Sequence, residues 1–215
     1  MTTEGKNLIR VELHLHTCFS KDSLMKPERV VRCCQSKGIT RFAVTDHNEI
    51  DGAFAVQALA PDSVIVGEEI ETTEGELLGY FMSEKIPAGL PPMETIERLK
   101  AQGAVISVAH PFDTVRTRHW SRESLLMMTP YIDAIEVFNA RCLTMQPNDD
   151  AASFAEEHEL LATVGSDAHS CWEMGQASLH MPSFKDSAEF KEALSKSRQE
   201  VRLSPMFVHG YSPCV

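Results

Sequence analysis

Short apolar runs alternate along the chain with segments in which apolar residues recur every three or four positions. The runs, such as Val-Ile-Ser-Val-Ala at 105–109, are typical of strands that are covered on both faces. The other segments have helical spacing, as at 92–102. The pattern predicts strands at 9–15, 41–45, 63–70, 76–82, 104–109, 134–138 and 161–165, and helices at 27–35, 92–102, 148–159 and 187–195.

Proline and glycine mark the ends of two of these helices. Pro27 and Pro92 stand where a first helical turn begins, and Gly38 and Gly103 follow the corresponding last turns. Seven strands that alternate with helices predict an α/β fold with parallel strands. The chain has no long linker, internal repeat or low-complexity tract, so we predict a single domain over residues 1–215.

Polar and metal-competent residues stand at the end of nearly every predicted strand. They are His14, His16, Asp46, His47, Glu69, His110, Asn139, Asp167 and His169. A β/α barrel brings the C-terminal ends of all its strands to one face, whereas an open sheet gathers its functional residues at one switch point. Because these residues follow strands along the whole chain, the pattern favours a barrel.

Composition indicates an ordinary soluble globular protein, with 43% hydrophobic and 24% charged residues. No apolar run approaches the ~20 residues that span a bilayer, and residues 1–6 are polar with no signal core behind them. We therefore expect a cytoplasmic protein without membrane association. None of the six cysteines forms a CxxC pair, and adjacent Cys33 and Cys34 cannot easily bridge each other, so we expect free thiols.

The formal net charge of −11 bears on the partner. Proteins that bind a nucleic-acid backbone usually present a basic surface, so long nucleic acid is an unlikely partner. A small phosphorylated substrate remains compatible with this charge if metal ions reverse the sign locally.

Two histidine motifs suggest metal binding. In a strand, His14 and His16 point the same way and can present two imidazoles to one cation, although two buried structural histidines would show the same pattern. In the second motif Asp46 could orient an imidazole as a second-layer partner of a metal ligand, or the Asp46–His47 pair could cap a loop.

Four further residues add to this set. His110 stands between an apolar strand and Pro111, where a structural role is as plausible as a functional one. Asp167 and His169 repeat the two-residue spacing, and Glu69 is a carboxylate on a buried strand that must be paired or coordinated. Five of the nine histidines lie at strand ends, which supports a shared site. A set that combines imidazoles with carboxylates suits Zn²⁺, Mn²⁺ or Fe²⁺ better than Mg²⁺ or Ca²⁺, which prefer oxygen ligands.

The ordered motifs resemble those of the PHP (polymerase and histidinol phosphatase) domain family, from about residue 10 to residue 203. They are His14-Leu15-His16, Asp22, Thr45-Asp46-His47, Gly67-Glu68-Glu69, Ala109-His110-Pro111 and Gly165-Ser166-Asp167-Ala168-His169. The resemblance implies a distorted, TIM-like (β/α)7 barrel that holds two or three divalent metal ions (Zn, Mn or Fe).

The resemblance also implies a division of the ligands among the metals. His14, His16, Glu69 and Asp167 would hold the first ion, with Glu69 bridging to the second, and His47, His169 and Asp22 would complete the second. His110 would belong to the third. Many family members carry a histidine where this chain has Glu76, so a third ion would have a weakened site or none.

The function that the resemblance implies is that of a metal-dependent phosphoesterase, in which a metal-bridging hydroxide attacks phosphorus. Asp167 and His169 would handle protons, and His119 would protonate the leaving group. The substrate phosphate would be bound by a polar set comprising Arg116, Arg118, Asn139 and Arg141.

Three alternatives stay open: an amidohydrolase or lactonase, an exonuclease acting on nucleic-acid ends, and a metal-binding module without activity. The loops at 21–26, 113–123 and 141–148 contain no evident aromatic platform for a base, and a packing role is expected for Trp120 and Trp172. The physiological substrate and the oligomeric state cannot be predicted from the sequence.

Overall fold

A nine-stranded mixed sheet forms the centre of the computed structural model, which describes residues 8–116, 118–206 and 208. The strands are β1 (Ile9–Glu12), β2 (Arg41–Val44), β3 (Val64–Glu71), β4 (Glu76–Tyr80), β5 (Val105–Val108), β6 (Ala134–Asn139), β7 (Leu161–Gly165), β8 (Ala177–Met181) and β9 (Arg198–Val201). The helices are α1 (Pro27–Ser36), α2 (Asp51–Leu59), α3 (Pro92–Ala101), α4 (Arg122–Met128), α5 (Gln146–Glu157) and α6 (Ser187–Leu194), with a 3₁₀ turn at Thr129–Tyr131.

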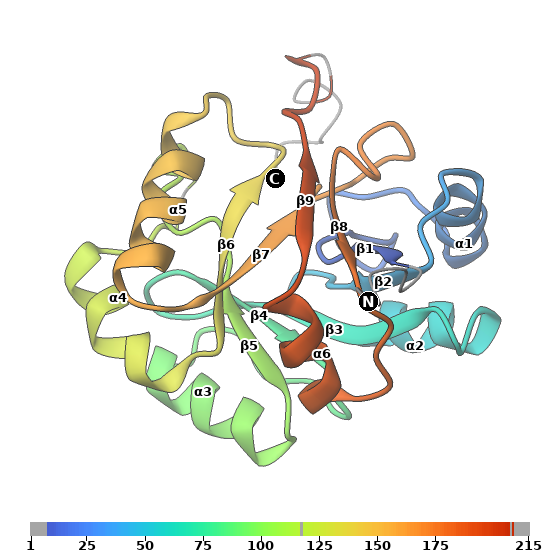
Figure 1. Cartoon of the computed structure of the whole chain (residues 1–215). Coiled ribbons are helices and arrows are strands. Elements are labelled where there is room, and N and C mark those ends of the chain that lie inside the picture. The colour runs from blue at the N-terminus through green and yellow to red at the C-terminus, as the bar shows by residue number, and fades with distance from the viewer. Residues whose placement is uncertain (1–7, 117, 207, 209–215) are drawn as a thin grey trace, which may run out of the picture.

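The sheet runs in the order β7-β6-β5-β4-β3-β2-β1-β8-β9 and curves into a nearly closed barrel. Its strands pair in parallel except around β4 and between β1, β8 and β9. Beyond the named strands, Leu15 bridges to Ala168, and the His16 N–H donates to the Ala168 carbonyl at 2.9 Å. The ends of β1 and β7 are therefore joined, and helices pack around the outside of the barrel (Figure 1).

The predicted distorted (β/α)7, TIM-like barrel is wrong in the number and direction of its strands. Four residues, 72–75, separate β3 from β4. A parallel connection needs a crossover of about a dozen residues, so β3 and β4 can only form an antiparallel hairpin. The apolar pattern also missed β8 and β9. All four side chains of β9 are exposed, and such a strand leaves no apolar signal.

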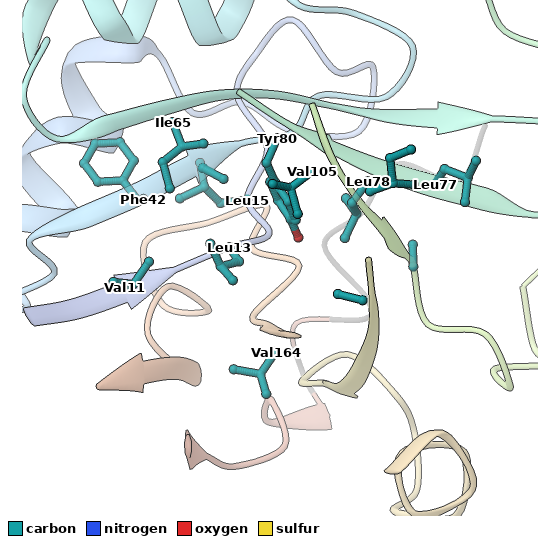
Figure 2. Close-up of a cluster of buried hydrophobic side chains, with 14 of the residues drawn as sticks. Val11, Leu13, Leu15, Phe42, Ile65, Leu77, Leu78, Tyr80, Val105 and Val164 are labelled. Carbon is teal, nitrogen blue, oxygen red and sulfur yellow. The ribbon is translucent and has the colours of Figure 1, made fainter. Parts of the chain in front are cut away.

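Buried hydrophobic side chains of the strands and helices form one continuous core, and part of it is shown in Figure 2. Along the segment that begins with β1, Val11, Leu13 and Leu15 are fully buried in this cluster. Successive strand residues face opposite ways, so the equally buried His14 and His16 face the other side. The alternation thus separates apolar packing from a buried polar site on one short segment.

One disulfide corrects the expectation of free cysteines. Cys33 of α1 and Cys171, in the loop after β7, are bonded with their Cα atoms 5.8 Å apart. Cys18, Cys34 and Cys142 are free, and Cys214 lies outside the described residues. A separation of 138 positions gave no sign of this pairing, which depends on α1 packing beside the loop.

In the described part of the chain, no helix has the length and apolar character that a membrane crossing requires.

Candidate metal centre

Imidazoles and carboxylates from six strands gather at one end of the barrel. They come from His14 and His16 after β1, His47 after β2, Glu69 in β3, Glu76 in β4, His110 after β5 and Asp167 and His169 after β7. Glu76 is the first residue of its strand rather than the last. Because β4 runs opposite to its neighbours, its beginning lies at the same end as their C-terminal ends.

Glu69 lies at the centre of this group and is fully buried. Its Oε2 is 3.0 Å from His47 Nδ1 and 3.1 Å from His14 Nε2. The same oxygen is 3.4 Å from His16 Nε2. Its Oε1 is 2.9 Å from His110 Nε2. One carboxylate thus contacts four imidazoles, an arrangement that suits a bridging ligand.

Asp167 closes the group from the β7 side. Its Oδ1 is 3.1 Å from His16 Nε2 and 3.7 Å from His14 Nε2. Its Oδ2 accepts a hydrogen bond from the Arg116 guanidinium at 2.5 Å. The backbone of Asp167 is left-handed, with φ of 51°, a conformation that aspartate and asparagine tolerate better than most residues.

Asp22 joins the group from the loop after β1. Its Oδ2 is 2.9 Å from His169 Nε2 and 3.4 Å from His47 Nε2. The His16 ring stacks against the rings of His47 and His169, with centroids 4.5 and 4.3 Å away. The structure thus places the Asp22 carboxylate beside both outer histidines.

Glu76 lies on the His110 side of the centre. Its Oε2 is 3.5 Å from His110 Nε2, and its Oε1 is 3.8 Å from His47 Nδ1. Burial, followed by the negative charge of Glu69, raises the pKa of Glu76. An added positive charge between these residues would favour ionised Glu76.

The pKa values of the clustered residues show how their charges depend on one another. Burial alone would lower the pKa of His47, but Glu69 and Asp22 raise it to about 10. For Glu69, burial alone would raise the pKa, but the charges of His14 and His47 hold it well below its usual range. The pKa of His16 falls to about 3 because of burial and the neighbouring His169 and His47. The carboxylates of the centre therefore favour positive charge beside them.

Three buried atoms indicate where cations would bind. His16 Nε2, Asp22 Oδ1 and Asp167 Oδ1 are buried without a well-aligned hydrogen bond among the described residues, although the first and last lie 3.1 Å apart, whereas buried polar groups are normally satisfied. Where the structure describes the chain, three sets have donor atoms within 4.8 Å of one another: His14, His16 and Glu69; His16, His47 and His169; and His47, Glu69 and Glu76. Mixed imidazole and carboxylate donors fit Zn²⁺, Mn²⁺ or Fe²⁺.

Hydrogen bonds on the far side of two rings favour the tautomers that a metal site needs. His14 Nδ1 is 2.9 Å from Glu136 Oε1, and a carboxylate there accepts the Nδ1 proton. His16 Nδ1 is 3.2 Å from Ser20 Oγ, and this hydroxyl donates its own proton to Asp46 at 2.9 Å. In both histidines the Nε2 lone pair is then left facing the centre.

In the described part of the chain, the side-chain hydrogen bonds of Asp46 go to the loop after β1, and it reaches an imidazole through Ser20. Its Oδ1 accepts the Thr17 N–H at 2.6 Å, and its Oδ2 accepts the Thr17 hydroxyl at 2.6 Å. It acts on His16 through Ser20, whose Oγ also accepts the His47 N–H at 2.9 Å. Asp46 therefore both caps the loop after β1 and orders the histidines that flank it.

Glu136 of β6 supports the centre, and sequence reasoning missed it. Besides its contact with His14, its Oε2 accepts the His110 N–H at 2.9 Å and the Asn139 amide at 3.1 Å. Gly165 makes this approach possible, because a Cβ there would lie 2.3 Å from both Glu136 Oε1 and His14 Cβ. The available signal was a carboxylate inside the apolar run at 134–138.

Comparison with known proteins agrees with this geometry. The PHP domain family model matches residues 12–132, and a PHP-associated model matches residues 146–198. The chain belongs to the PHP family.

Two matches illustrate the range of similar proteins. This PHP chain is 37% identical over 172 residues to the uncharacterized protein MJ0417 of Methanocaldococcus jannaschii, covering 79% of this chain and 69% of that one. A two-domain protein from Bacteroides vulgatus that contains a predicted PHP-like metal-dependent phosphoesterase has a TM-score of 0.73 at 19% identity, over 93% of this chain and 66% of that one.

The same fold also occurs in a solved structure of a protein named as an amidohydrolase. An amidohydrolase from Chromobacterium violaceum, solved with bound sulfate and no metal, has a TM-score of 0.59 at 15% identity, over 74% of this PHP chain and 87% of that one. At this level of identity the likeness concerns the fold alone.

Three of the four proposed substrate-binding residues lie at the PHP centre. Arg116 reaches Asp167, and Asn139 Nδ2 is 3.3 Å from the same carboxylate. Arg141 lies 2.6 Å from His169 Nδ1 and 3.3 Å from Glu173 Oε1. These polar groups line the β6–β7 side of the cluster.

Arg118 and His119 lie apart from it. Arg118 pairs with Glu71 and donates to the Thr72 carbonyl at 3.2 Å. His119 is exposed, and its Nδ1 is 3.4 Å from the Arg116 carbonyl. In the described part of the chain, neither residue has a hydrogen bond, ion pair or ring contact with the clustered imidazoles and carboxylates.

We expect Glu136→Gln to weaken metal binding about 10- to 100-fold, because the amide is a poorer acceptor for the His14 proton and can set the wrong tautomer. Titration of the metal-free protein with Mn²⁺ or Zn²⁺ against a competing chelator measures this. Thermal unfolding of the metal-free variant serves as the control for folding. Unchanged affinity would show that Glu136 has only a packing role.

Proposed function

We propose that this PHP protein is a metal-dependent phosphoesterase that hydrolyses a small phosphorylated substrate. The proposal depends chiefly on one observation, the gathering of imidazoles and carboxylates around Glu69 with two guanidinium groups beside them. Metal ions and arginine are the groups that bind and neutralise phosphate oxygens, so their combination favours phosphate esters over uncharged substrates.

In this proposal two metal positions are shared among the clustered residues. One would be held by His14, His16, Glu69 and Asp167, and the other by Asp22, His47, His169 and Glu69. His110 and Glu76 would contribute to a third position. Divalent metals bound there lower the pKa of water toward ~7 and polarise the phosphoryl group.

The chain's own residues orient the substrate and move protons. Arg116 binds Oδ2 of Asp167 and leaves Oδ1 facing the centre. Arg141, which lies beside His169 Nδ1, is the second guanidinium proposed to hold a phosphate oxygen. Asp167 and His169 are the groups proposed to take up and return protons. His119 is not needed for any of these steps.

The acidic balance of the chain favours a small substrate. With a net charge of −11, long-range repulsion opposes a polyanion, whereas local cations can still attract a single phosphate group. An exonuclease acting on short ends is therefore the weaker alternative, and its binding should decrease steeply with salt.

A substrate panel under one metal condition tests the proposed reaction. We expect Mn²⁺-loaded protein to hydrolyse an aryl phosphomonoester or phosphodiester and to lose this activity after chelation. An anilide and a lactone are assayed in parallel, because an activated water attacks carbon as well as phosphorus. Metal-dependent hydrolysis of the anilide or lactone without the phosphate esters would overturn the proposal.

A further inference from the structure

Two exposed apolar side chains lie within three residues of members of the metal centre in the sequence. Leu24 is 84% exposed and Trp172 is 73% exposed, the two largest values for large hydrophobic side chains in the described part of the chain. Leu24 comes two residues after Asp22, and Trp172 comes three residues after His169. Exposed apolar side chains beside a buried polar centre are candidates for substrate contacts.

The two loops that carry these side chains touch each other. Asp22 Oδ2 is 2.9 Å from His169 Nε2, and Ser23 Oγ donates to the His169 carbonyl at 3.3 Å. With 3.8 Å between consecutive Cα atoms, the Cα of Trp172 lies within about 11 Å of that of His169. The loop that carries Trp172 therefore starts at the centre itself.

The backbone around Trp172 is held on both sides. Cys171 is bonded to Cys33 of α1, and Gln176 Nε2 donates to the Trp172 carbonyl at 3.2 Å. The buried Glu173 accepts the Ser170 hydroxyl at 2.7 Å and the His169 N–H at 3.1 Å. An exposed indole on a loop fixed in this way requires little ordering when a ligand binds.

The two tryptophans differ in a way that the sequence did not show. Trp120 is 5% exposed and packs over Gly75, as expected for a packing residue. The same expectation for Trp172 is wrong. In the described part of the chain, its ring has no aromatic or cation–π partner.

We propose that Trp172 is a recognition platform for a flat aromatic group on the phosphorylated substrate. This inference rests on the proposed phosphoesterase function and adds the class of organic group that the substrate carries. An indole face stacks well on a planar ring, and stacking tolerates many ring types. Specificity would then come from the position of the ring relative to the phosphate.

Two phosphomonoesters separate recognition from chemistry: 1-naphthyl phosphate, which carries a flat ring, and butyl phosphate, which does not. We expect Trp172→Ala to lower the naphthyl-to-butyl ratio of kcat/KM about 10- to 100-fold, mainly through the KM for the naphthyl ester. Trp172→Phe should retain most of the ratio.

Leu59→Ala is the matched control. Leu59 is 50% exposed at the end of α2, and because α2 starts near the C-terminal end of β2, its last residue lies toward the other end of the barrel. This variant should keep the wild-type ratio. An equal loss on both esters in Trp172→Ala would mean that the loop only positions His169, and an unchanged ratio would also overturn the platform.

A measurement of binding alone tests the platform separately from the proposed phosphoesterase activity. Calorimetry on the Mn²⁺-loaded protein compares 1-naphthyl phosphate with inorganic phosphate. If wild type binds the naphthyl ester more tightly than phosphate but hydrolyses neither ester, the phosphoesterase proposal fails and the platform stands. If Trp172→Ala binds the naphthyl ester as tightly as wild type does, or wild type shows no preference for it, the platform proposal fails.

Discussion

Asp167→Asn should lower the turnover of an aryl phosphate at saturating Mn²⁺ by at least about 10³-fold while the protein stays folded. The carboxylate lies 3.1 Å from His16 Nε2 and 3.7 Å from His14 Nε2, and its other oxygen accepts a hydrogen bond from Arg116. An amide of the same shape removes the negative charge from this position. Both the metal and the guanidinium then lose a charged partner.

The folded state should survive this change because asparagine tolerates the left-handed backbone that Asp167 adopts. Thermal unfolding followed by circular dichroism checks it. Asp150→Asn is the matched control, since Asp150 lies on the exposed side of α5 and accepts a hydrogen bond from Gln146 there. Near-normal turnover by folded Asp167→Asn would reject the proposed centre.

Glu69→Gln should reduce metal affinity by more than about 100-fold and remove at least one ion per chain. Glu69 contacts four imidazoles, and a bridging carboxylate serves two ions at once. The neutral amide offers one weaker acceptor and a nitrogen that cannot bind a cation. Metal analysis of protein passed through a desalting column, together with a Mn²⁺ titration, measures the change.

The neighbouring glutamate provides the control. Glu68 is also buried, but it faces the opposite side of β3, where its Oε2 accepts the Ile86 N–H at 2.9 Å. Glu68→Gln makes the same chemical change one residue away and should leave the metal content near that of wild type. Equal metal loss in both variants would indicate a general disturbance of β3 rather than the loss of a ligand.

The predicted secondary structure depended on local signals and was largely recovered. The strand at 161–165 coincides with β7, and the helix at 27–35 matches α1 to within one residue. An apolar run and a proline at a first turn act over a few residues, so they can be recognised without knowledge of the fold. The helices α2 and α4 were not predicted.

Strand direction and pairing were less accessible. The four residues between β3 and β4 already excluded a parallel crossover, and the hairpin was missed because the alternation of strands and helices was applied to the whole chain. The pairing of Cys33 with Cys171 left no local trace, since it depends on two segments that meet only in the folded barrel.

The sequence by itself determined which chemical groups stand at the strand ends, because the two-residue spacing of His14 with His16 and of Asp167 with His169 sets their direction locally. The tertiary structure alone decided which of those groups meet. It reversed the direction of β4, so that this strand begins with Glu76 at the metal centre. It also placed Glu136 behind His14 and left Arg118 and His119 outside the cluster. Contacts between residues far apart in sequence follow from chain reversal and packing, and these have no local signature along the chain.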